Sequence, residues 1–129
     1  MKANIGNEDL QLECLVYVVQ NNNFELLRYL ITEVKLDKDI LQRATNNQQG
    51  KQGRTIVHIA AELGHDLMLY FFGEMGLDID LADENGDTPL HLAVQHNQAS
   101  SLRFLLSLSA ELNVQNSKRQ TPLHVAVIT

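Results

Sequence analysis

A seven-residue motif that begins with threonine and carries histidine at its fourth position occurs three times in this chain of 129 residues. The copies begin at Thr55, Thr88 and Thr121, so that each starts 33 residues after the one before it. A fixed period of this length is typical of solenoid proteins, in which each repeat is one supersecondary unit that packs on its neighbours. The spacing therefore predicts a stack of similar units.

The residues around each motif carry the signals of helix ends. The hydroxyl of Thr88 can cap a helix, and Pro89 follows at a position where a backbone N–H would lack an intrahelical partner anyway. Gly64 and Asn97 tolerate the left-handed backbone of a short turn between two helices. Small residues at one repeat position let paired helices approach closely: Ala60, Ala93 and Ala126.

Residues 86–93 resemble the ankyrin repeat, whose pattern is Gly-x-Thr-Pro-Leu-His-x-Ala and whose period is also 33 residues. The resemblance implies an all-α fold, an ankyrin-repeat solenoid of stacked helix-turn-helix units with protruding β-turn or hairpin loops. One ankyrin-repeat domain then spans residues 1–129. It divides into a divergent N-terminal capping repeat (9–50), two repeats (51–83 and 84–116) and an incomplete final repeat (117–129).

The first unit departs from the common period. If Asn22 corresponds to Gly64, the register is 42 residues, so that extra residues must lie between Leu36 and Gly53. We expect an extra helical turn at 37–44 and a mobile polar loop at 45–52.

The histidines do not form a metal site by their spacing. His58, His91 and His124 occupy one repeat position, and stacked helices lie about 8–10 Å apart, too far for shared zinc ligands at about 2 Å. We expect them instead to bond neighbouring loops. Catalytic motifs such as HExxH and G-x-S-x-G do not occur, and Cys14 in an apolar helix is expected to be inert core. Neither an enzyme nor a cofactor is predicted.

Composition limits the class of partner. The net charge of −6 without a basic run disfavours direct nucleic-acid binding, and no apolar stretch approaches the roughly 18 residues of a membrane helix. A single cysteine fits a reducing compartment, so the cytoplasm or nucleus is expected.

The remaining candidates lie on the expected surface. Residues 74–87 hold six acidic residues and no Lys or Arg, whereas the next equivalent loop contains Lys118 and Arg119. Two interpretations stand: the loops are charged only to stay solvated, or their alternating potential selects and orients a charged partner. The resemblance implies binding of another protein through loop tips and the concave face of the first helices. The candidate residues are Glu62, Leu63, Asp83, Glu84, Asn85, Asp87, Gln95, His96, Asn116, Ser117, Lys118 and Arg119.

Residues 86–129 also resemble the opening repeats of inhibitors of NF-κB and of NF-κB precursor proteins, through the ending Gln-Thr-Pro-Leu-His-x-Ala-Val-Ile-Thr. That resemblance implies a regulator that masks a Rel-type transcription factor. A structural segment of a larger ankyrin protein, without a partner of its own, is the alternative. Ankyrin domains are also hydroxylated at an asparagine matching Asn113, with a leucine at the position of Leu105. The short final unit indicates either a truncated parent or self-association through an exposed edge.

Overall fold

The structure, a computed structural model, describes residues 8–34, 41 and 53–128. Within these ranges all regular secondary structure is helical. The helices are α1 (Glu8–Gln20), α2 (Phe24–Thr32), α4 (Ile56–Leu63), α5 (Asp66–Glu74), α6 (Pro89–Gln95), α7 (Ala99–Ser107) and α8 (Pro122–Ile128).

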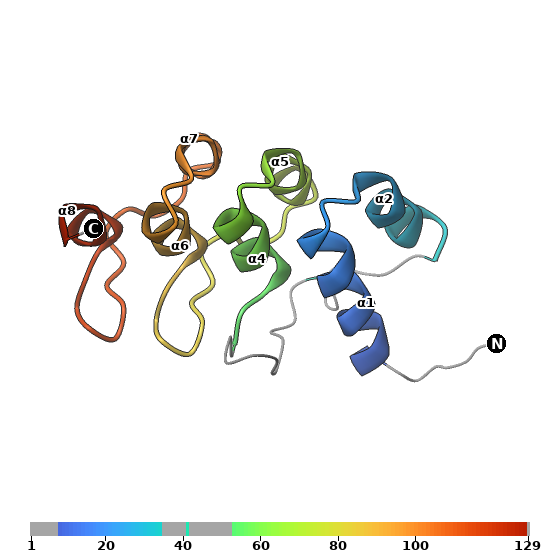
Figure 1. Cartoon of the computed structure of the whole chain (residues 1–129), viewed down its shortest axis with the longest axis horizontal. Helices are drawn as coiled ribbons and strands as arrows, with labels where there is room; N and C mark the ends of the chain where they lie inside the picture. The colour runs from blue at the N-terminus through green and yellow to red at the C-terminus, as the bar shows by residue number, and fades with distance from the viewer. Residues whose placement is uncertain (1–7, 35–40, 42–52, 129) are drawn as a thin grey trace.

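The helices stack in two rows along an elongated molecule (Figure 1). The inner row contains α1, α4, α6 and α8, each in contact with the next, and the outer row contains α2, α5 and α7. The loops that precede α6 and α8 project from the inner row on one side. Each of these loops contains a β-turn, closed by the Gly86 N–H on the Asp83 carbonyl and by the Arg119 N–H on the Asn116 carbonyl, as the ankyrin resemblance implied. The fold is thus the predicted all-α solenoid of helix pairs with protruding loops.

Helix starts follow the threonine motif. Thr55 and Thr88 are the N-caps of α4 and α6, and the side-chain oxygen of each accepts the backbone N–H of the histidine three residues later. The turns within the helix pairs are left-handed at Asn22 (φ 55°), Gly64 (φ 76°) and Asn97 (φ 57°). These angles confirm the predicted turn residues and the alignment of Asn22 with Gly64.

The core is continuous along the stack. It contains fully buried side chains from both rows, among them Leu15 of α1, Leu27 of α2, Phe72 of α5 and Leu105 of α7. The edge of one aromatic ring meets the face of another between α2 and α5, where the centroids of Phe24 and Phe71 are 5.3 Å apart. Because each unit shares its apolar surface with the next, the first helix pair (α1 and α2) and the threonine-led units stabilise one another.

Two predictions about the first unit fall on described residues, Cys14 and Leu41. Cys14 was expected to be core, but its side chain is exposed on α1, because the buried face of that helix is formed by Leu15, Val18 and Val19. Of the predicted helical turn at 37–44 only Leu41 is described, and it is helical and buried. The predicted loop at 45–52 lies outside the described residues.

Candidate protein-binding surface

The motif histidines join each inner helix to the following loop. The Thr55 backbone N–H donates to Nδ1 of His58 over 3.1 Å, so Nδ1 is the unprotonated nitrogen and Nε2 carries the hydrogen. Nε2 then donates to the carbonyl oxygen of Asp87 over 2.8 Å. His91 repeats the arrangement and donates to the carbonyl oxygen of Gln120 over 2.8 Å. These bonds confirm the prediction that the histidines bond neighbouring loops.

Burial sets the protonation of the first of these histidines. The side chain of His58 is fully buried, and this desolvation lowers its pKa below the ordinary 6.5, against the opposing effects of the Asp87 hydrogen bond and the Asp83 charge. The neutral ring is therefore the form that the fold requires.

The loop at 83–87 is organised by one carboxylate. Oδ1 of Asp83 accepts the backbone N–H groups of Asn85 and Asp87 at 2.8 and 2.9 Å. In the next loop Oδ1 of Asn116 does the same for Lys118 and Gln120, both at 2.9 Å. The two loops are linked to each other because the amide of Asn116 donates to Oδ1 of Asp87 over 2.9 Å.

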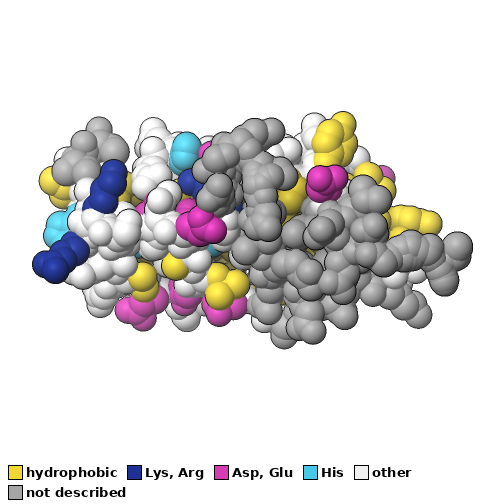
Figure 2. All heavy atoms as spheres, turned by 90° about the horizontal axis from the view of Figure 1, so that it is seen from below, with side chains coloured by type: hydrophobic (Ala, Val, Ile, Leu, Met, Phe, Trp, Pro, Cys, Tyr) yellow, Lys and Arg dark blue, Asp and Glu magenta, His cyan; other side chains and the backbone are white. Residues whose placement is uncertain are grey.

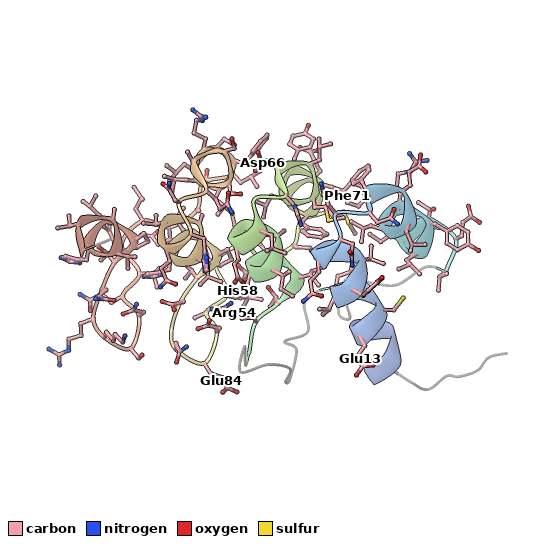
Figure 3. All side chains as sticks on the ribbon, in the orientation of Figure 1. Glu13, Arg54, His58, Asp66, Phe71 and Glu84 are labelled. Atoms are coloured by element: carbon pink, nitrogen blue, oxygen red, sulfur yellow. The ribbon has the colours of Figure 1, made fainter. Side chains whose placement is uncertain are left out.

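An ion-pair network centred on Arg54, which is labelled in Figure 3, ties the loop at 83–87 to α4. The guanidinium of Arg54 donates to Oδ2 of Asp83 at 3.2 Å and to Oε1 of Glu62 at 2.8 Å. The three side chains are only 12%, 1% and 10% exposed. Nε2 of His96 lies 3.6 Å from the other carboxylate oxygen of Glu62. Sequence reasoning missed Arg54, although it stands alone as a cation at the repeat position of Asp87 and Gln120.

Burial corrects the predicted contact set. Four of the twelve candidates are buried and bonded within the scaffold, and are therefore not presented to a partner: Glu62, Asp83, Asp87 and Asn116. Their polar groups form hydrogen bonds or ion pairs with the loop backbone and with neighbouring side chains. These pairings depend on the packing of the loops and cannot be recognised in the sequence. The other eight are exposed, and we call them the exposed set: Leu63, Glu84, Asn85, Gln95, His96, Ser117, Lys118 and Arg119.

The structure brings the loop members of the exposed set together. The backbone N–H of Ser117 donates to the carbonyl oxygen of Asn85 over 2.9 Å, so the two turns lie side by side. Glu84 stands at the tip of its loop (Figure 3). Seen from the loop side, Lys and Arg side chains gather at the end of the molecule formed by α8, and acidic side chains lie further along (Figure 2). The surface is therefore charged in a definite order along the stack.

Within the described ranges no group of three or more His, Cys, Asp or Glu side chains is placed to hold a metal ion. None of the described helices combines the length and the apolar character needed to cross a membrane.

Residues 75–129 match the family model of ankyrin repeats, which describes three copies of the unit. These residues are ankyrin repeats. Together with the stacked helix pairs, the match makes the fold an all-α ankyrin-repeat solenoid. No curated protein matches the chain. Ankyrin repeats serve as protein–protein interaction modules, and residues 75–129 are repeats of this kind.

Proposed function

We propose that this chain is a non-catalytic regulatory adaptor or inhibitor that binds another protein through its loop tips and the ends of its inner helices. One observation carries the proposal. The buried polar residues between the repeats are hydrogen-bonded or ion-paired within the fold. The exposed set lies on successive loops and at the ends of α4 and α6, outside the core.

The loops are held rigidly enough to act as recognition elements. Asp83 and Asn116 each fix two backbone N–H groups, and Arg54 ties the first of these loops to α4. A surface that is ordered before binding loses less conformational entropy on association. A partner that spans the repeats would bury a standard interface of about 800 Å² on each side.

Affinity capture with matched variants tests the proposal. A triple alanine variant at Leu63, Gln95 and His96 should lose proteins that the unchanged chain captures from a cell lysate. A control variant carries alanine at three exposed outer-row residues, Leu67, Arg103 and Leu106, and should capture them normally. An identical set of captured proteins for both variants would contradict binding by the inner row.

A Rel-type transcription factor is one candidate partner, supported only by the resemblance of residues 86–129 to inhibitors of NF-κB. Binding of a purified Rel homology domain tests it directly. A structural segment without a partner is the alternative, and it predicts that no protein is captured by the unchanged chain. We place the protein in the cytoplasm or nucleus on the strength of its single cysteine.

Two smaller proposals remain. Asn113 is exposed and Leu105 is buried, an arrangement that leaves the asparagine amide accessible to a hydroxylase. Mass spectrometry of protein from animal cells should show the gain of one oxygen atom at Asn113, and an unmodified residue would end this idea.

Leu123 and Val127 of α8 are 72% and 78% exposed, which supports self-association. A concentration-independent monomer in sedimentation would contradict it.

A further inference from the structure

Arg119 occupies a backbone position that the preceding loops give to glycine. Its φ is 62°, against 74° for Gly53 and 78° for Gly86 at the equivalent positions. L side chains rarely adopt this left-handed conformation, because the Cβ atom approaches the following carbonyl oxygen. A strained residue persists where the surroundings hold it, and such residues gather at functional sites. Arg119 is therefore a departure from the repeat that calls for a reason.

Glycine at this position allows one loop to stack on the next. A Cβ atom at Gly86 would lie 2.8 Å from the backbone nitrogen of Ser117 and 2.9 Å from Cα of Asn116. A Cβ atom at Gly53 would likewise lie 2.9 Å from the backbone nitrogen of Glu84. Arg119 has both a Cβ and a long side chain, so a further loop of the same kind cannot approach the 116–120 loop as closely. One side of this loop is kept open by the residue itself.

The open loop carries two cations. The side chains of Lys118 and Arg119 are exposed, and neither has an ionic or hydrogen-bonding partner within the described part of the chain. The exposure of Lys118 does not depend on its place near the edge, since Asn85 is also exposed at the equivalent position between two neighbours. The tip of the adjacent loop carries the acidic Glu84 (Figure 3). The positive charge is therefore confined to the 116–120 loop.

We propose that the 116–120 loop, with Lys118 and Arg119, is a docking point for an acidic segment of a partner protein. The inference rests on the proposed protein-binding function and specifies the chemistry of the bound segment. A peptide segment rich in Asp or Glu supplies carboxylates for the two cations. A nucleic acid supplies anions as well, but binding its continuous phosphate chain needs more cations than the two on this loop, whereas two cations can match a short acidic segment.

Backbone NMR titration tests this directly. Adding an oligoglutamate peptide to the ¹⁵N-labelled chain should shift the amide signals of residues 116–121, and a glycine-serine peptide of equal length should not shift them. Raising the salt concentration should weaken the effect, because the cations are exposed.

A double variant, Lys118→Asn with Arg119→Gly, recreates the residues of the preceding loop. It should bind oligoglutamate about tenfold more weakly, since two exposed charge pairs are lost. Its melting temperature should not fall, because glycine suits the left-handed position. Weaker binding therefore cannot be attributed to unfolding.

Three results would overturn the inference. They are the lack of shifts at 116–121 up to millimolar peptide, equal binding by the double variant, and tighter binding of a single-stranded DNA oligonucleotide at the same signals. The proposed function has its own test. If the triple alanine variant on α4 and α6 loses captured proteins while oligoglutamate fails to bind, only the present inference fails.

Discussion

The Nε2–H group of His58 donates to the carbonyl oxygen of Asp87 across 2.8 Å, and thereby joins α4 to the loop in front of α6. His91 makes the same bond to the carbonyl oxygen of Gln120. In both cases the acceptor lies 29 residues after the histidine in the chain. The threonine-histidine motif is therefore a connector as well as a helix start. Each copy couples the stability of one repeat to the position of the next loop.

Replacing a connecting histidine should weaken the whole stack. We expect His91→Ala to lower the free energy of unfolding by about 1–3 kcal/mol, because the carbonyl of Gln120 and the N–H of Thr88 lose their partner. His124→Ala is the matched control, since its Nε2 connects to no described loop, and it should cost less. Urea denaturation measures both. Equal losses would show that the inter-repeat bond contributes nothing.

Stability should depend on pH through His58. Its pKa in the folded chain lies below the ordinary 6.5 of the unfolded chain, so below that value the unfolded state binds more protons. The contribution of the neutral ring is complete above the unfolded pKa and is lost as the pH falls through the folded pKa. The free energy of unfolding should therefore decline on acidification from about pH 7.5 to 5.5. In His58→Ala this part of the decline should vanish, and an unchanged pH profile would refute the assignment.

Asp83 should behave as a scaffold residue. We expect Asp83→Ala to lower the free energy of unfolding by about 2 kcal/mol, because the partly buried guanidinium of Arg54 and two loop N–H groups lose an acceptor. Asp83→Asn retains a hydrogen-bond acceptor and should cost less. Thermal and urea unfolding measure these changes. A fully stable Asp83→Ala that loses a partner would instead restore this residue to the binding surface.

Gly86 should resist the smallest substitution. In Gly86→Ala the new methyl group would lie 2.8 Å from the backbone nitrogen of Ser117 while φ stays at +78°, so we expect a loss of about 2 kcal/mol. Gly73→Ala is the control, since its methyl group would meet only the side chain of Leu108, which can move. Comparison of the two unfolding curves decides the point. A Gly86→Ala variant as stable as the control would remove the steric basis of loop stacking.

The repeat and its local devices could be predicted from the sequence. Threonine caps, left-handed turns at Gly64 and Asn97, and the structural role of the histidines depend on a few neighbouring residues and on one period. The sequence could not show which of the twelve surface candidates are buried and which are exposed. Asp83 and Glu84 are adjacent acidic residues in one loop, yet the side chain of Asp83 is buried and Glu84 is exposed to solvent.

The sequence by itself determined the solenoid, because a period of 33 residues with caps and turns at constant offsets leaves few other ways to stack the units. Only the tertiary structure decided which charges are available. Arg54 reaches Asp83, which lies 29 residues away, and Asn116 reaches Asp87 over the same separation. Such bonds form only after the loops have stacked, since buried polar groups must find partners wherever packing places them. The candidate binding surface therefore consists of the exposed set, whose side chains lie outside these buried bonds.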